Sequence, residues 1–184
     1  MIRVMILSLI FFMHGMYLFA TGQFSDILIW NGNEYTITAN YPMQDYFEIF
    51  PEKRPPPAGS ALQRGYIATY EIINNELWLI DIKIPNGNYS IINGNFIIGY
   101  TSIINEFLNG EERLKFIWFN GYLILPQGNI IGYEQAGYEA SFENYLIIEI
   151  HDGDFIYEMS MNYEQYEEYF LNEITKVYWK GFSN

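Results

Sequence analysis

The chain has 184 residues, no cysteine and a formal net charge of −13, from 22 acidic and 9 basic side chains. Half of its residues are hydrophobic, which excludes a disordered chain, and the lack of cysteine excludes disulfides and thiolate metal sites. The acidic balance argues against binding to nucleic acid or to anionic lipid, because phosphate groups are contacted by clustered Lys and Arg.

The first segment, residues 1–22, is predicted to be a secretory signal peptide. Arg3 precedes an apolar run from Val4 to Ala20, and small residues follow at the cleavage site. The run is shorter than the roughly 20 apolar residues that span a bilayer. We therefore expect cleavage after Gly22 without stable membrane insertion, and an uncleaved anchor is the alternative. Residues 23–184 would then form one globular domain, exported to the periplasm or out of the cell.

Short runs of alternating hydrophobic residues, separated by Asn-Gly or similar turns, predict a chain of β-hairpins. The predicted pairs of strands are 26–30 with 33–38, 64–73 with 76–84, 89–92 with 96–100, 114–119 with 122–125, and 144–150 with 155–161. In the first hairpin Leu28 is expected opposite Tyr35. Residues 126–129 are expected to form a further turn into a strand over 130–133.

Three helices are predicted between these strands. Pro42 at a first helical position favours a short helix over 42–50, and a second short helix is expected over 101–108. The proline-rich run 51–60 cannot pair as a strand and is expected to be an exposed loop. Asn162 and Gln165 have the spacing of a capping box, followed by an apolar stripe over 163–179 that should pack on the sheet.

These elements predict an α+β fold. We expect a meandering, twisted antiparallel sheet of about ten strands, open or curled toward a barrel, with a C-terminal amphipathic helix.

The hairpin over 64–84 contains one candidate site. A turn at Asn74-Asn75 places Glu71 opposite Trp78, Thr69 opposite Ile80, and Ile67 opposite Ile82. Both faces are largely apolar, so we expect this hairpin to be covered on both sides. A carboxylate in apolar company either has its pKa raised or pairs with a cation, for which Arg64 is the nearest candidate. A structural ion pair or a simple edge position is the alternative.

The segment Gly132–Tyr145 is the second candidate site, predicted to be a loop. Its glycines, aromatic rings and carboxylates suit a sugar or a cationic partner, and paired carboxylates could hydrolyse a glycan. The candidate binding residues there are Tyr133, Tyr138, Glu139, Glu143 and Tyr145, with Glu134 as a further carboxylate. The alternative is that the loop only covers the core.

Other catalytic and metal-binding patterns are weak. His151, the only histidine after the predicted signal peptide, sits beside the tight turn Asp152-Gly153 and is expected to be a solvated surface residue. Asp154 adds a second carboxylate at this turn, but further calcium ligands do not follow at the required spacing. We therefore expect no catalytic residue, no metal and no cofactor.

Several strings of the chain resemble a family of small secreted bacterial proteins of unknown function. They are SALQRGYIATYEI, NELWLIDI, WFNGYLILPQG and GYEASFENYLIIEI. The resemblance extends from Asp26 to about Tyr169 and leads us to expect an aromatic residue before Arg64, where this chain has Gln63. It implies a single exported domain, with no activity, substrate or cofactor.

The sequence thus predicts an exported, acidic, non-enzymatic binding or structural protein. One alternative is an inhibitor or immunity-type protein that pairs with a basic protein, since complementary charge speeds association. A carbohydrate is the other expected type of ligand. The remaining alternative is a carboxylate-dependent glycan hydrolase using Glu71, Glu134, Glu139 or Glu143.

Overall fold

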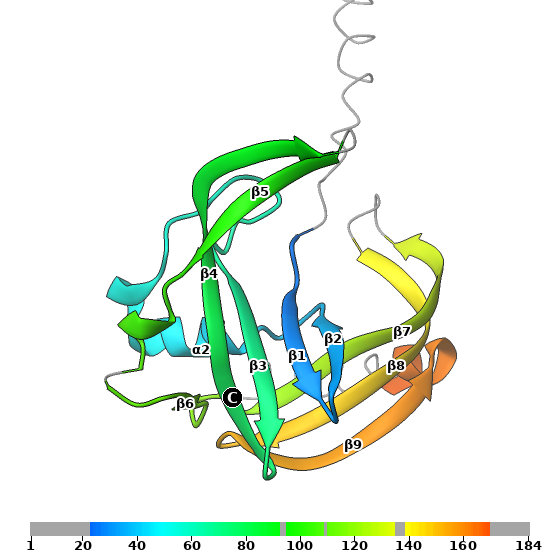
Figure 1. The fold of residues 1–184 in the computed structure, drawn as a ribbon. Coiled ribbons are helices and arrows are strands. Elements are labelled where there is room, and N and C mark those ends of the chain that lie inside the picture. Colours follow the sequence, from blue (N-terminus) through cyan, green and yellow to red (C-terminus); the bar gives the residue numbers. More distant parts are fainter. Residues whose placement is uncertain (1–22, 93–94, 109, 135–138, 170–184) are drawn as a thin grey trace, which may run out of the picture.

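The computed structural model describes residues 23–92, 95–108, 110–134 and 139–169 (Figure 1). Within them, nine strands form one curled sheet in the order β2-β1-β3-β4-β9-β8-β7, with β5 and β6 each paired to β4. The strands are β1 (Asp26–Trp30), β2 (Asn33–Ile37), β3 (Ile67–Ile73), β4 (Glu76–Ile92), β5 (Asn95–Ser102), β6 (Leu114–Lys115), β7 (Gly121–Glu134), β8 (Glu139–His151) and β9 (Asp154–Asn162). The α+β prediction is confirmed, and the sheet is open. It is antiparallel except between β1 and β3, which are parallel.

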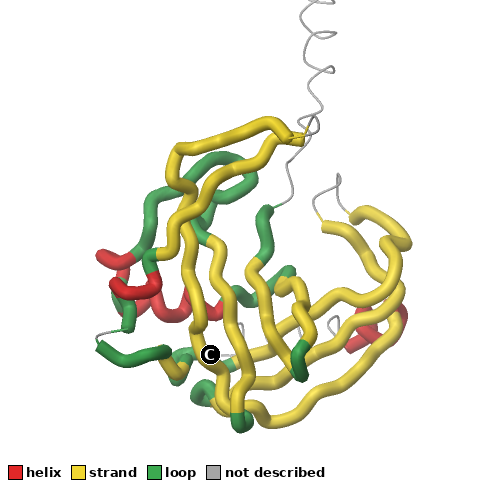
Figure 2. The backbone as a smooth tube through the Cα atoms, in the orientation of Figure 1, coloured by secondary structure: helices red, strands yellow, loops and turns green. Residues whose placement is uncertain are grey.

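Helices are few in the part of the chain that the structure describes (Figure 2). The helix α2 (Pro42–Ile49) starts at the predicted proline, and η1 (Pro51–Lys53) is a single 3₁₀ turn at the start of the proline-rich segment. The predicted helix over 101–108 is wrong. Thr101 and Ser102 end strand β5, and only η2 (Ile104–Glu106) forms a 3₁₀ turn.

Turn chemistry fixes the first hairpin as predicted. Asn31 and Gly32 adopt φ values of 51° and 75°, the left-handed geometry of a tight two-residue turn. Leu28 therefore lies opposite Tyr35, and Ile29 lies opposite Glu34. The parallel pairing of β1 with β3, which places Ile29 beside Glu71, is a long-range contact that no local pattern predicts.

The β3–β4 hairpin follows the predicted register near its turn and departs from it beyond a bulge. Glu71 lies opposite Trp78 as predicted, but Thr69 lies opposite Asp81 and not Ile80. Ile67 accordingly pairs with Lys83 and not with Ile82. One face of β3 is buried in the core, while the other is only half-buried, so the prediction that both faces are covered is wrong.

Strand β4 continues past the sheet to form a second hairpin with β5. Tyr89 pairs with Ile98, and Ile92 pairs with Asn95, as the predicted hairpin requires. The predicted turn residues 93–94 lie outside the described residues.

The segment 114–145 departs most from prediction. Leu114 and Lys115 pair with β4, so the expected hairpin with 122–125 is wrong. The expected turn over 126–129 is also wrong, because β7 runs straight on and pairs with β8 along its length. A register shift between Gln127 and Ile130 accommodates Pro126 and Gly128 without reversing the direction of the chain. The predicted loop Gly132–Tyr145 is consequently a pair of strands in its described part.

The β8–β9 hairpin forms around the predicted turn, with Ile150 opposite Phe155. A bulge between Glu149 and Ile150 shifts the register beyond that pair. Tyr157 therefore lies opposite Glu149, and Glu158 lies opposite Ile148.

Two hydrophobic clusters form the core, one on each face of the β7–β8 region. The first fills the inside of the curled sheet and is continuous with α2; its largest fully buried members include Tyr66, Tyr70, Phe107, Phe116, Leu28, Met43, Leu77 and Leu123. The second lies on the opposite face and contains Ile124, Tyr145 and Ile147.

Residues 163–169 form a helix that packs on this second cluster. Its predicted capping box is confirmed, since the Gln165 N–H donates to Asn162 Oδ1 at 2.9 Å and the Asn162 N–H donates to Gln165 Oε1 at 3.0 Å. Tyr166 stacks on Tyr145 with ring centroids 3.9 Å apart. The predicted remainder of this helix lies outside the described residues.

Candidate functional site

The half-buried outer face of β1, β3 and β4 brings two of the predicted site residues together. The strand registers place five residues side by side in one row across the sheet. They are Glu34, Ile29, Glu71, Trp78 and Lys115. We call this row, with the neighbouring outward residues Ile27, Ile67, Thr69 and Ile73, the Glu71 face. Strand alternation places all of these side chains on the side of the sheet away from the first core cluster.

The centre of the Glu71 face is apolar and its margin is charged. Ile29 and Trp78 flank Glu71 directly. At the margin, Lys115 Nζ lies 2.7 Å from both Glu76 Oε1 and Asp154 Oδ1, and the Arg113 guanidinium lies 5.6 Å from the centre of the Trp78 ring. An apolar centre with a charged margin is the usual anatomy of a protein–protein interface.

Glu71 itself has no ion pair or hydrogen bond to another side chain within the described part of the chain. The nearest lysine in its row, Lys115, is already engaged by two other carboxylates. A carboxylate beside isoleucine and tryptophan loses its water when a partner covers this face, so a cation supplied by that partner would be bound favourably there.

Arg64, the predicted partner of Glu71, pairs instead with Asp26. The Arg64 Nη2 atom lies 3.2 Å from Asp26 Oδ1, and the two side chains are 9% and 0% exposed. The guanidinium stacks on Tyr41, 3.4 Å from the ring centre, and also donates to the Phe24 carbonyl. Arg64 and Asp26 therefore tie the entry of β1 to the start of β3, and the proposed Arg64–Glu71 pair is wrong.

The Asp26 carboxyl is the most perturbed acid of the described residues. Burial raises its pKa to about 6, although Arg64 and the Ala68 N–H act in the opposite direction. Asp26 Oδ2, Arg64 Nε and Tyr66 Oη are buried without a hydrogen-bond partner among the described residues. This polar cluster lies inside the protein, where it affects the stability of the fold.

The second predicted site does not form a loop around a pocket. Glu143 accepts hydrogen bonds from the Asn129 N–H at 3.0 Å and Asn129 Nδ2 at 3.1 Å, which hold the bulge of β7 and lower the Glu143 pKa. The Tyr145 hydroxyl accepts from the Phe142 N–H at 3.0 Å, with the ring in the second core cluster. These two residues therefore have structural roles.

The remaining predicted residues of that segment are described only in part. The backbones of Tyr133 and Glu139 belong to β7 and β8, with Glu134 directly opposite Glu139, and their side chains lie outside the described atoms. Tyr138 lies outside the described residues altogether.

A shallow pocket of about 260 Å³ lies elsewhere, between the start of α2 and the start of β7. It is lined by Asn40, Tyr41, Gln44, Asp45, Phe119, Asn120, Gly121 and Tyr122. Asp45 is its one carboxylate, and burial with nearby Glu48 raises the Asp45 pKa. No local sequence pattern indicates this pocket, because Asn40 donates to the carbonyl of Tyr122, which is 82 positions away. A single carboxylate does not supply the pair that glycoside hydrolysis needs.

The chain matches no family model, no curated protein and no solved structure. The resemblance to small secreted bacterial proteins therefore stays a prediction. Among the described residues, no helix is long and apolar enough to cross a membrane.

Proposed function

We propose that the protein is an exported, non-enzymatic binding protein that engages a basic protein partner through the Glu71 face. The observation that carries this proposal is the carboxylate of Glu71, which is half-buried between Ile29 and Trp78 without a cation of its own. A lysine or arginine of a partner would complete the charge pair, while the apolar surroundings would exclude water from it.

The net charge of −13 supports a basic partner. Opposite net charge speeds diffusional encounter, and a charged margin fixes the orientation of two surfaces. The carbohydrate alternative relies on an open loop over Gly132–Tyr145. Its described part consists of paired strands, so this alternative loses its main support.

The proposal is tested by affinity capture from the exporting cell with two isosteric variants. Glu71→Gln is expected to weaken binding of the captured basic protein by about 2 kcal/mol or more, roughly 30-fold, because it leaves the partner's cation unpaired. Glu48→Gln changes an exposed carboxylate on α2, outside the face, and is expected to bind as the parent does. Equal capture by parent and Glu71→Gln protein would reject the Glu71 face as the binding surface.

Export is the second part of the proposal and has its own test. The apolar run Val4–Ala20 behind Arg3 is the supporting observation. Mass spectrometry of protein collected outside the cytoplasm is expected to find Gln23 at the amino terminus. Protein that still begins with Met1 would contradict cleavage.

A further inference from the structure

The outer part of the β4–β5 hairpin, residues 86–92 with 95–99, projects from the body of the molecule; we call it the arm (Figure 1). Within the described residues, strand β5 pairs with β4 alone. A two-stranded hairpin is marginally stable in water without a surface to pack on. We therefore expect the arm to pack against another surface.

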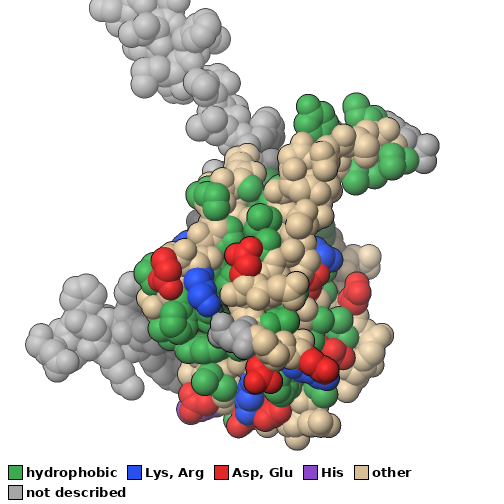
Figure 3. Space-filling view, turned by 60° about the vertical axis from the view of Figure 1, so that its left-hand side comes forward, with side chains coloured by type: hydrophobic (Ala, Val, Ile, Leu, Met, Phe, Trp, Pro, Cys, Tyr) green, Lys and Arg blue, Asp and Glu red, His purple; other side chains and the backbone are tan. Residues whose placement is uncertain are grey.

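The arm exposes large apolar side chains on both of its faces. Tyr89, Ile91, Ile92 and Ile97 are between 44% and 73% exposed. Strand alternation and the observed register place Tyr89 and Ile91 on one face, and Ile92 and Ile97 on the other. Figure 3 shows hydrophobic side chains on both sides of the projecting hairpin. An exposed apolar cluster of this kind marks an interaction site.

The base of the arm has a defined geometry. The register shifts between Pro85 and Tyr89, where Gly87 has a φ of +77° and Asn86 Oδ1 accepts from the Asn88 N–H at 3.0 Å. A side chain at Gly99 would approach this bulge too closely, with Cβ 2.7 Å from Asn86 Oδ1. The arm therefore leaves the body of the sheet at a β-bulge.

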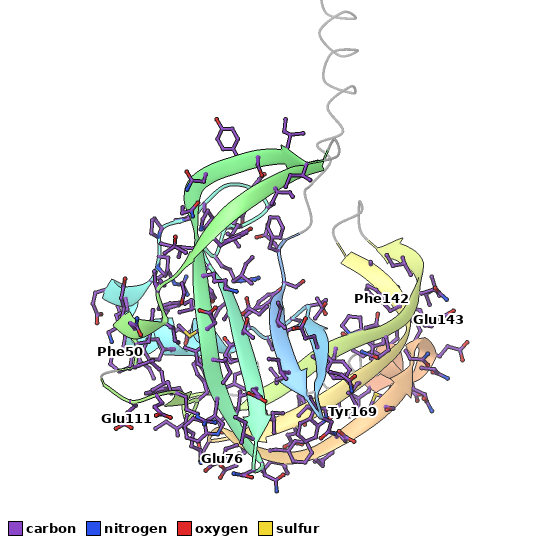
Figure 4. The ribbon with its side chains drawn as sticks, viewed as in Figure 1. Phe50, Glu76, Glu111, Phe142, Glu143 and Tyr169 are labelled. Atoms are coloured by element: carbon purple, nitrogen blue, oxygen red, sulfur yellow. The ribbon has the colours of Figure 1, made fainter. Side chains whose placement is uncertain are left out.

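The arm carries no charge. The sequence has no Asp, Glu, Lys or Arg from Ile84 to Asn105, although the whole chain has a net charge of −13. Acidic residues such as Glu76 and Glu111 lie at the opposite end of the molecule (Figure 4). The arm is thus uncharged and apolar, whereas the charged side chains belong to the rest of the molecule.

The described chain begins at Gln23, just before β1. Gln23 Nε2 donates to the Ser60 carbonyl, and the Phe24 N–H donates to the Ala61 carbonyl at 2.8 Å, which fix the chain there. In the export proposed above, the run Val4–Ala20 brings the chain to a membrane, so this step of the inference rests on the proposed function.

We propose that the arm docks on the surface of a lipid bilayer whose headgroups carry no net charge. Lipid surrounds the tip and covers both apolar faces, whereas edge-to-edge pairing with a second copy would leave both faces in water. A tyrosine such as Tyr89 is favoured at the level of the lipid headgroups. The backbone N–H and C=O groups at the strand edges need hydrogen-bond partners, so the arm can insert only as far as the interface, where water and headgroups supply them. Anionic lipid would repel the acidic body. This proposal stands apart from the Glu71 face.

The absence of cysteine permits a site-specific test in the full chain. Ile92→Cys and Ile156→Cys are each labelled with an environment-sensitive fluorophore, because these isoleucines are 53% and 51% exposed and lie on the arm and on β9. Ile91→Cys supplies a second position on the arm. Each protein is mixed with phosphatidylcholine vesicles, with and without a nitroxide-labelled phosphatidylcholine, after circular dichroism has confirmed an unchanged fold.

We expect a blue shift and quenching by the nitroxide lipid at positions 91 and 92, and neither at position 156. Quenching at none of the three positions, or equally at all three, would overturn the proposal. A blue shift on the arm that needs no vesicles and grows with protein concentration would also overturn it, because it would assign the arm to contact between copies. An added Ile91→Asp substitution in the protein labelled at position 92 is expected to abolish the quenching there, whereas membrane attachment through the N-terminal run alone would leave it unchanged.

Discussion

Replacing Arg64 with methionine is expected to lower the free energy of unfolding by about 3–5 kcal/mol above pH 6, because it leaves the buried Asp26 carboxylate without its cation. This loss in the free energy of unfolding should be smaller below pH 6. Loss of the cation raises the Asp26 pKa further, so the carboxyl is protonated and neutral in acid and no longer needs a partner. Denaturant unfolding followed by circular dichroism on both sides of pH 6 measures this difference.

The parent protein should show the corresponding pH dependence. The folded Asp26 pKa of about 6 lies above its ordinary value of 3.8, so the folded state binds the extra proton. This contribution to stability is full below pH 3.8 and is lost as the pH rises through 6. Arg54→Met, at an exposed arginine, is the control and is expected to change stability by no more than about 0.5 kcal/mol. An Arg64→Met effect that is equally large at both pH values would contradict the assigned role of Asp26.

Gly153→Ala is the second substitution with a large expected effect. Gly153 has a φ of +77°, and a Cβ there would lie 2.6 Å from the Phe116 carbonyl oxygen. Its own carbonyl accepts from the Leu77 N–H at 2.8 Å, and its N–H donates to the Phe119 carbonyl at 3.3 Å. The β8–β9 turn is thereby joined to β4 and to the segment before β7. We expect a loss of about 1–2 kcal/mol for the left-handed conformation and a further 1–3 kcal/mol for the forced backbone shift.

Gly32→Ala separates these two causes. Gly32 has nearly the same φ, +75°, but nothing lies within 4 Å of the added Cβ. It should therefore show only the conformational cost in the same denaturant titration. Equal losses for Gly153→Ala and Gly32→Ala would mean that the packing of the turn against Phe116 contributes nothing.

Local turn chemistry explains which parts of the fold were predictable. Tight turns at Asn31-Gly32, Asn74-Asn75 and Asp152-Gly153 fix the register of the residues beside them, and all three form as predicted. Bulges were not predictable, because each depends on how the partner strand fits and inverts the faces beyond it. Pro126 and Gly128 were interpreted as a turn, whereas a shift of register within β7 accommodates both.

The candidate sites show the same contrast between contacts set by a local turn and contacts set by long-range strand pairing. Glu71 and Trp78 each lie three residues from the Asn74-Asn75 turn, so their pairing follows from the sequence. Asp26 and Arg64 are 38 positions apart, and their contact depends on the parallel pairing of β1 and β3. The arm was predicted as a hairpin, but its isolation from the body was not, since its apolar composition alone fits a buried strand equally well.

The most direct test of the proposed function is a charge exchange across the Glu71 face. Once the captured partner is purified, Glu71→Lys is expected to abolish binding in a titration at low ionic strength, because two cations would meet in an apolar contact. Changing the facing lysine or arginine of the partner to glutamate should restore binding to the Glu71→Lys protein. Full affinity of Glu71→Lys for the unmodified partner would contradict the account.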